Sequence, residues 1–238
     1  MAPMRVRVDL LPHMPAPDVA VIVDVLRASS AIALLLGRGA SEVWVTASLR
    51  AARNLEGLKL GEREGLPPEG FHHGTDLKTL SKIEVEGRRI VYTSENLPRA
   101  LAALRGTPRL FLGSFRNARA LLAKLEGGTR EVRLVASGHR GRVALDDTLA
   151  AGFLAKRLVR AGGEGEGDGF LLATRLLKAF PDPQEGLWQS EVGRWLAGLG
   201  FTEDLALATL ISHDPVVPEL VRQEEALGRP VYVFARAG

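Results

Sequence analysis

The apolar run at residues 19–23, followed at once by a helix pattern, constrains the fold of this chain more than any other feature. VAVIV is typical of a central strand that is buried on both faces, and Ser29 begins a helix that continues with IALLL. Asp24 and Arg27 therefore lie at the carboxyl end of a buried strand. Open α/β sheets bind ligands at this edge, where the following helix also presents free backbone N–H groups.

The rest of the chain repeats the alternation of strand and helix. Strand patterns occur at residues 5–10, 41–45, 57–65, 88–93, 109–113, 131–137 and 230–237, and helix patterns at 49–55, 96–105, 117–126, 145–162, 170–180, 188–200 and 203–214. This alternation favours a layered α/β fold over separate all-α and all-β regions.

Two segments interrupt the alternation. Residues 65–82 predict a long surface loop, of the kind that serves as a lid or specificity loop. Its adjacent His72 and His73 lack a third ligand at a helical spacing, which favours solvated histidines over a zinc site. Residues 162–169, GGEGEGDG, predict a flexible connection. Because a strand returns to the sheet after it, we interpret residues 1–238 as a single interlocked domain.

The composition of the chain limits which metals and which macromolecular partners it can bind. With no cysteine, any metal must be held by oxygen or imidazole. The net charge of +3 is slight and no nucleic-acid-binding motif is present, so we expect no nucleic-acid partner. No apolar run has the length of a membrane span, and the first residues lack the apolar stretch of a signal peptide. We therefore expect no membrane association and a cytoplasmic location; the oligomeric state stays open, a homo-oligomer included.

Polar residues follow the predicted strands. In chain order they are Asp24 and Arg27, Glu62 and Arg63, residues 93–96, Ser114 and Asn117, and residues 138–147. A parallel arrangement of the strands would gather these side chains at one edge of the sheet.

Several motifs, in a fixed order, resemble those of one known family. They are DVLRASSA at residues 24–31, GEREG at 61–65, GF at 70–71, GSFRNA at 113–118, ALDDTLAAG at 144–152, SEVGRWLAGLGFTEDL at 190–205 and VVPEL at 216–220. With them the chain resembles the 2-phosphosulfolactate phosphatase family, magnesium-dependent enzymes that make sulfolactate on the route to coenzyme M. The resemblance implies a three-layer α/β/α fold with a mixed, largely parallel sheet, Mg²⁺ as cofactor, and a small phosphorylated, sulfonated acid as substrate.

Phosphate-ester hydrolysis requires cations that neutralise the phosphoryl oxygens, and an oriented water or nucleophile. Mg²⁺ prefers oxygen ligands and retains waters, so one or two carboxylates suffice. Asp24 and Asp147 are the first choices as metal ligands, with Asp146 and Glu62 second. The alternative for Asp146 and Asp147 is a structural role in the first turn of a helix, where acids are favoured anyway.

Arg27 and Arg63 could bind phosphate or sulfonate through paired N–H groups, or form ordinary ion pairs with Asp24 and Glu62. Asp24, Arg27, Glu62, Arg63 and Asp147 are thus the catalytic candidates. The candidates for substrate binding are Ser29, Asn96, Gly113, Ser114 and Asn117. Ser114 could instead be only a helix N-cap, the commoner use of such a serine.

The chain departs from the family's motifs in two places. A GNSP-like segment is replaced by residues 74–77, GTDL, and a TTTNGT-like segment by residues 93–97, TSENL. Two acids, Asp76 and Glu95, are thus added near the anion site and would repel a highly charged substrate, and Leu97 would prevent the close backbone approach that glycine permits. We therefore expect weaker use of 2-phosphosulfolactate, or preference for a less anionic phosphoester.

Three classes of function follow from the sequence. The first is a Mg²⁺-dependent phosphatase acting on 2-phosphosulfolactate or a related small phosphorylated acid. The second is a diverged phosphatase with another phosphoester substrate, and the third is a non-catalytic anion-binding protein on the same scaffold.

Overall fold

Strand β2, Val19–Val23, is buried along its whole length between two parallel neighbours, β6 and β7. Its unbroken apolar sequence suits this position, because side chains on both faces of the sheet are covered. The structure is a computed structural model and describes residues 2–126 and 128–238. Helix α1, Ala28–Gly37, follows β2, and all but its last residue is buried.

The other elements follow the expected alternation. The strands are β1 Arg5–Asp9, β3 Glu42–Thr46, β4 Leu58–Gly61, β5 Arg89–Thr93, β6 Arg109–Gly113, β7 Glu131–Ala136, β8 Glu164–Gly165, β9 Pro218–Ala226 and β10 Arg229–Arg236. The helices are α2 Leu49–Asn54, α3 Leu77–Leu80, α4 Asn96–Ala103, α5 Ala118–Leu125, α6 Leu145–Arg160, α7 Asp168–Ala179, α8 Pro183–Gln189, α9 Glu191–Gly198 and α10 Thr202–Ala208.

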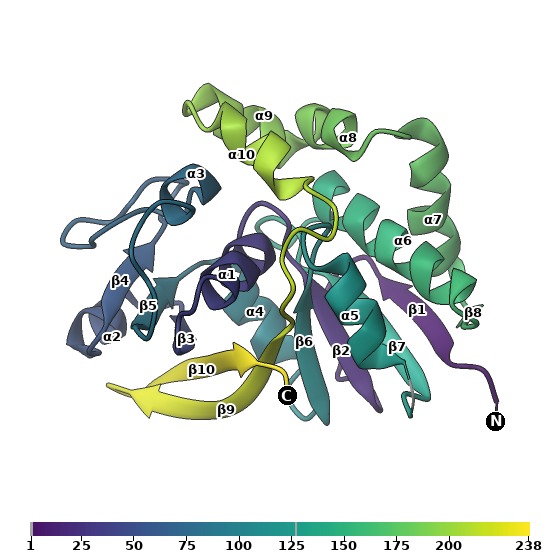
Figure 1. The fold of residues 1–238 in the computed structure, drawn as a ribbon, viewed down its shortest axis with the longest axis horizontal. Coiled ribbons are helices and arrows are strands. Elements are labelled where there is room, and N and C mark those ends of the chain that lie inside the picture. The colour runs from purple at the N-terminus through teal and green to yellow at the C-terminus, as the bar shows by residue number, and fades with distance from the viewer. Residues whose placement is uncertain (1, 127) are drawn as a thin grey trace.

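The strands of the described residues form one mixed sheet in the order β4-β5-β3-β10-β9-β6-β2-β7-β1-β8. Parallel pairing joins β4, β5 and β3 on one side and β6, β2, β7, β1 and β8 on the other. Between these groups lies the antiparallel hairpin β9–β10, which Figure 1 shows running across the base of the molecule. The expected three-layer α/β/α fold with a mixed, largely parallel sheet is confirmed.

The hairpin is the main element that the sequence pattern misses, because only β10 carries an apolar pattern. Strand β9 reads PELVRQEEA and, apart from the buried Pro218, is half-buried or exposed, so its sequence resembles a charged loop. Its partner supplies the apolar side chains, and Leu227 and Gly228 make the turn with φ of 52° and 70°. Positive φ at both central residues is typical of a tight hairpin turn. The hairpin pairs with β6 only between Phe111 and Glu219.

Two segments expected to be irregular contain short elements. The loop at residues 65–82 includes α3, whose first turn is capped by Asp76 through a hydrogen bond from the Thr79 N–H, at 2.8 Å. The Gly-rich segment at 162–169 includes β8, which pairs in parallel with β1. The flexibility of that segment, like the single-domain interpretation, stays a prediction.

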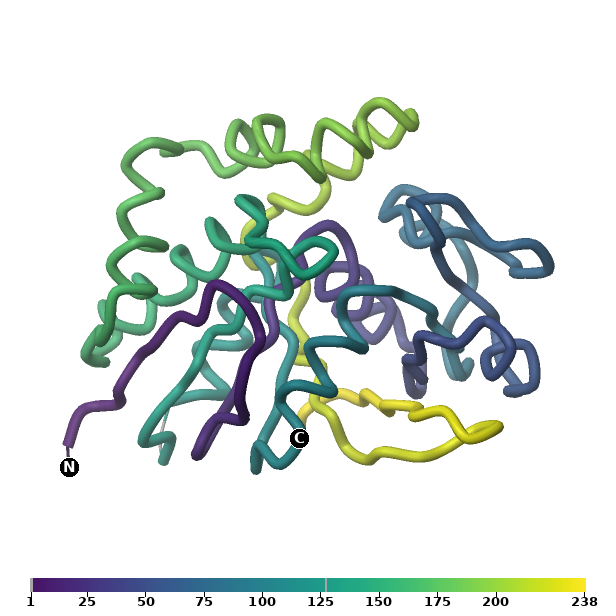
Figure 2. Tube along the Cα trace, turned by 180° about the vertical axis from the view of Figure 1, so that it is seen from behind, coloured from purple at the N-terminus to yellow at the C-terminus, as the bar shows by residue number. Residues whose placement is uncertain are grey.

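Helices α8, α9 and α10 lie together beyond one end of the sheet (Figure 1), and α7 leads to them along the edge that carries β1. Viewed from behind, the green stretch from α7 to α10 passes over the strand ends (Figure 2). Ser190 separates α8 from α9, because its hydroxyl accepts the Gly193 N–H at 2.8 Å and starts a new helix. This helical segment supplies one wall of the site described below.

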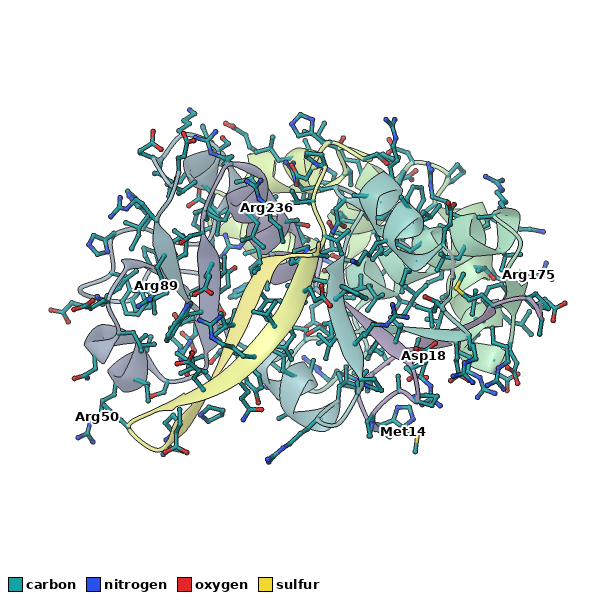
Figure 3. All side chains as sticks on the ribbon, turned by 60° about the horizontal axis from the view of Figure 1, so that its bottom comes forward. Met14, Asp18, Arg50, Arg89, Arg175 and Arg236 are labelled. Atoms are coloured by element: carbon teal, nitrogen blue, oxygen red, sulfur yellow. The ribbon has the colours of Figure 1, made fainter. Side chains whose placement is uncertain are left out.

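One continuous apolar core joins both groups of strands, from Val6 in β1 to Phe234 in β10. Charged side chains connect elements around it. Arg236 of the hairpin, labelled in Figure 3, donates from Nε to the carbonyl of Leu36 in α1 at 2.9 Å. None of the helices in the described part of the chain has the length and hydrophobicity needed to cross a membrane.

Candidate active site

The loops that follow β2, β4, β5 and β7 meet around one pocket. Asp24 and Arg27 line it after β2, Glu62 after β4, residues 94–96 after β5 and His139 after β7. Both parallel groups of strands therefore contribute, although the antiparallel hairpin lies between them in the sheet. The expectation that polar strand ends gather in one place is confirmed for these residues.

The pocket is closed by segments beyond the sheet. Thr75, just before α3, lines it and is buried, and Trp195 of α9 lines it with Val192 and Leu196 of the same helix. The rings of His139 and Trp195 are in contact, with centroids 5.6 Å apart. Burial lowers the pKa of His139, so at pH 7 this imidazole is mostly neutral and adds little positive charge.

Asp24 is the most enclosed acid of the lining, with 5% exposure. Its Oδ1 accepts the backbone N–H of Ala28 at 3.2 Å, and its own N–H donates to Ser29 Oγ at 3.0 Å. Burial raises the pKa of Asp24 to about 6, and the Glu62 carboxylate adds to the shift. Asp24 therefore gains and loses its proton near neutral pH, which is typical of a group that binds a cation or transfers a proton.

Asp146 and Asp147, in the first turn of α6, are both buried. Asp147 accepts one hydrogen bond on each oxygen, from the N–H groups of Val25 and Gly138, each at 2.9 Å. It therefore connects the loop after β2 to the loop after β7. Burial raises the pKa of Asp147 well above its ordinary value, and the Asp146 and Asp24 carboxylates raise it further.

Asp146 differs from its neighbour, because its Oδ1 is buried and has no hydrogen-bond partner among the described residues. Burial raises the pKa of Asp146 to about 7, and the negative charge of Asp24 contributes. A buried acceptor without a partner costs free energy, so such an atom calls for a ligand, a proton or a cation.

The donor set fits a hard divalent cation. Asp24, Glu62 and Glu95 line the pocket, whereas Arg27 is the only lysine or arginine among the described lining residues. No cluster of three or more acidic or imidazole side chains suited to a metal was found in the described ranges. Mg²⁺, however, is commonly bound through one or two carboxylates with waters completing its shell. Asp146 and Asp147 are not part of this lining, but they lie close enough to Asp24 for its charge to raise their pKa values. Asp24 with Asp146 or Asp147 could therefore hold the cation.

Arg27 is held by groups that the sequence did not indicate. Its Nη1 donates to Asp204 Oδ2 at 3.2 Å, its Nη2 donates to the Gly65 carbonyl at 3.1 Å, and its guanidinium lies over the Phe201 ring at 4.9 Å. The expected alternative partner was Asp24, but the ion pair forms with Asp204. Asp204 is separated from Arg27 by most of the chain, and no local pattern connects the two.

Glu62 and Arg63 have different positions. Glu62 lines the pocket and accepts the N–H groups of Gly65 at 3.2 Å and Glu95 at 3.3 Å, which joins two loops. The guanidinium of Arg63 donates to the backbone carbonyls of Glu62 and Ala47 and is absent from the pocket lining. The structure therefore brings Glu62, but not Arg63, to the candidate site.

Three candidates for substrate binding lie at the junction between β6 and α5 and are absent from the pocket lining. Ser114 and Asn117 are fully buried, and Asn117 Oδ1 accepts the Ser114 N–H at 2.9 Å. Gly113 allows close packing, because a Cβ there would lie 2.6 Å from Val21 Cγ1. Ser29 is also buried, donating to the Ile22 carbonyl at 3.1 Å. The structure assigns these four residues to the framework.

The two segments that depart from the family's motifs divide between pocket and framework. Thr75, Glu95 and Asn96 line the pocket. Leu77 and Leu97 are fully buried among apolar residues, so the expected loss of a close backbone approach at Leu97 does not apply to the lining. Asn96 also accepts the N–H of Arg140 through Oδ1 at 3.1 Å, which ties the β5 loop to the β7 loop.

Known proteins resemble this chain over most of its length. Residues 6–223 match the model of a family described as 2-phosphosulpholactate phosphatase. A probable 2-phosphosulfolactate phosphatase of Deinococcus radiodurans is 37% identical over 225 residues, covering 92% of this chain and 94% of that protein. Proteins with the same printed name from Thermus thermophilus and Thermotoga maritima are 35% and 32% identical, covering 98% and 85% of this chain and 100% and 88% of theirs.

Proposed function

The chain belongs to the 2-phosphosulpholactate phosphatase family, and from this we propose that it hydrolyses the phosphate ester of 2-phosphosulfolactate, giving sulfolactate and phosphate, with Mg²⁺ as cofactor. It is a phosphoric monoester hydrolase. The observation that carries the proposal is the group of buried carboxylates, Asp24, Asp146 and Asp147, whose pKa values are raised beside a pocket with one arginine.

Charge supports a cation in the reaction. A phosphorylated, sulfonated acid carries several negative charges, and the lining adds the carboxylates of Asp24, Glu62 and Glu95. Arg27 alone cannot offset this repulsion, since its guanidinium is already paired with Asp204. Mg²⁺ held by Asp24 with Asp146 or Asp147 would supply Lewis-acid stabilisation of the phosphoryl oxygens.

The residues of the chain then have separate tasks. Arg27 donates its remaining N–H groups to phosphoryl oxygens, because two of its nitrogens already bind the protein and orient the fork. Through backbone N–H bonds, Glu62 joins the loops after β4 and β5, and Asp147 joins the loops after β2 and β7, so that four loops are held around the reacting group. Trp195 and its neighbours in α9 exclude bulk water from the pocket, which strengthens these electrostatic interactions.

The test is a panel of phosphorylated hydroxy acids, including 2-phosphosulfolactate and phospholactate, assayed for phosphate release with Mg²⁺ and with a chelator. We expect release that depends on Mg²⁺ and is fastest with 2-phosphosulfolactate. Release from another phosphoester only would favour a diverged phosphatase. No release from any compound, together with binding of inorganic phosphate, would refute the proposal in favour of an anion-binding protein.

A further inference from the structure

The contacts of Arg27 suggest that its orientation is set from the C-terminal helical segment. Arg27 is the only cationic lysine or arginine side chain of the described pocket lining, and its side chain is 4% exposed. Its partner Asp204 belongs to α10 and is 1% exposed. A cation this enclosed cannot reorient freely, so the groups around it decide which N–H bonds face a ligand.

Two residues of the α10 region contact the guanidinium from different directions. Asp204 Oδ2 accepts from Nη1 at the edge of the fork, at 3.2 Å, while the Phe201 ring lies against its face at 4.9 Å. The Gly65 carbonyl accepts from Nη2 at 3.1 Å. A guanidinium has five N–H bonds, and these contacts use two, so the bond on Nε and one on each Nη remain available.

Asp204 also reaches the loop that carries Thr75. Its Oδ1 accepts the N–H of Leu77, the first residue of α3, at 2.8 Å. One carboxylate thus connects α10, the pocket arginine and the segment that precedes α3. The Thr75 side chain is buried and lines the pocket, where its hydroxyl lies beside that of Tyr92.

A second buried ion pair, between Arg116 and Asp214, differs in how the guanidinium is hydrogen-bonded. Arg116 binds Asp214 through Nε and Nη2 at 2.7 and 2.9 Å, and its Nη1 donates to the Leu207 carbonyl at 2.6 Å. All three nitrogens are committed, as expected for a purely structural pair. Arg27, in contrast, is paired through two of its three nitrogens only.

We propose that Asp204 is a positioning residue for the reaction, which fixes the guanidinium of Arg27 so that its free N–H groups face the phosphoryl group. The proposal rests on the proposed function in taking a phosphoryl group as the ligand. Asp204 does not line the pocket, so it acts on binding through the groups it contacts, and the proposal assigns that action to Arg27 and not to its bond with the Leu77 N–H.

The experiment is a double-mutant cycle on the binding of inorganic phosphate, measured calorimetrically at fixed Mg²⁺ in wild type, Asp204→Asn, Arg27→Ala and the double variant. We expect Asp204→Asn to weaken binding about tenfold, the size of one charge-assisted contact, and to weaken it no further when Arg27 is already alanine. A tenfold loss that persists in the Arg27→Ala background, or no loss in the wild-type background, overturns the proposal.

Glu203→Gln is the matched control. Glu203 precedes Asp204 in α10 and also binds the α3 region, through an exposed pair with Lys78 at 2.6 Å, but it does not contact Arg27. Its loss should leave phosphate binding unchanged. If Asp204→Asn does not fold, Phe201→Leu takes its place in the same cycle, with the same two deciding outcomes at a smaller, roughly threefold, effect.

The cycle and the proposed function fail in distinguishable ways. The cycle measures the binding of inorganic phosphate and needs no turnover. A wild-type protein that binds phosphate but does not hydrolyse 2-phosphosulfolactate therefore refutes the proposed substrate, while the cycle still decides the role of Asp204. Where turnover is present, Asp204→Asn should raise KM with the same dependence on Arg27, whereas a merely structural role would lower the melting temperature without that dependence.

Discussion

Two junctions between strand and helix in this fold look alike in sequence and differ in what they do. The junction from β2 to α1 carries Asp24 and Arg27, and the junction from β6 to α5 carries Ser114, Arg116 and Asn117. The strands are neighbours, with Val23 paired to Gly113. Polar residues at the end of a buried parallel strand followed by a helix would suit an anion site at either place.

Hydrogen bonding separates the two. At the β6 junction, Asn117 bonds Ser114 N and the carbonyls of Leu112 and Val216, and Arg116 is fully paired with Asp214 and Leu207. At the β2 junction the pKa of Asp24 is raised and the nearby Asp146 Oδ1 has no partner in the described chain. Unsatisfied or weakly paired polar groups, more than polar residue types, indicate where a ligand binds.

The largest expected effect is on stability, at the junction from β6 to α5, which we call closed because its polar groups are hydrogen-bonded within the protein. Arg116→Ala should lower the free energy of unfolding by about 3–5 kcal/mol, because it leaves the Asp214 carboxylate buried without its partner. Urea denaturation measures this, with the exposed Arg119→Ala as the control. Phosphate affinity of the folded fraction should not change; a loss of affinity with intact stability would contradict the assignment of this junction to the framework.

Asp147→Asn should affect both stability and turnover. The carboxylate accepts two backbone N–H groups, whereas an amide accepts through one oxygen only, so we expect a loss of about 1.5–3 kcal/mol. Asp146→Asn provides the contrast in the same denaturation series, because it removes a buried charge without breaking such bonds. Equal destabilisation by both substitutions would be evidence against this division.

The pH dependence of Mg²⁺ stabilisation comes next in size. Burial raises the pKa of Asp24 to about 6 and of Asp146 to about 7. Without metal, the stability that these two protonated carboxyls contribute is therefore complete below about pH 4, the ordinary aspartate pKa, and is lost as the pH rises through 6 to 7. Mg²⁺ binds the ionised carboxylates and should therefore stabilise the protein more at pH 8 than at pH 5.

Thermal melts with and without Mg²⁺ at the two pH values measure this difference. A tenfold excess of Mg²⁺ over its Kd stabilises the folded state by about 1.4 kcal/mol. Asp24→Asn should remove most of that gain at pH 8. Identical shifts in melting temperature at pH 5 and pH 8 would argue against carboxylate ligands.

The smallest effect concerns substrate preference. Glu95 lines the pocket but is exposed, so its repulsion of an anionic substrate is screened and worth up to about 1 kcal/mol. Glu95→Gln should raise kcat/KM for 2-phosphosulfolactate relative to phospholactate, at most about fivefold. Glu64→Gln, on the nearby exposed loop outside the pocket lining, is the control. A ratio that stays the same in Glu95→Gln would show that this carboxylate faces solvent in the bound state.

The sequence predicted the layered fold because its central strand and alternating elements carry strong local patterns. It also singled out Asp24 and Glu62, which line the pocket, since strand ends are local features. The α6 acids, which it named as metal ligands, are buried outside that lining, and their role stays a prediction. It could not separate Ser114 and Asn117 from Asp24, because satisfaction of hydrogen bonds depends on residues such as Val216 that are distant in sequence. Asp204 was missed for the same reason, and β9 because its charged sequence has no apolar pattern.

One comparison of rates tests the central claim most directly, that the open β2 junction carries the chemistry and the closed β6 junction carries the framework. Phosphate release from 2-phosphosulfolactate at saturating Mg²⁺ is measured for Asp24→Asn and Ser114→Ala, with folded protein quantified in each. Asp24→Asn should retain less than about 1% of wild-type kcat/KM, because even groups that only support metal ligands cost up to about 100-fold. Ser114→Ala loses the acceptor of the Arg116 N–H and a long, 3.5 Å bond to Asn117 Oδ1, neither of which faces the pocket, and should remain within about threefold. An active Asp24→Asn beside an inactive, folded Ser114→Ala would contradict the account.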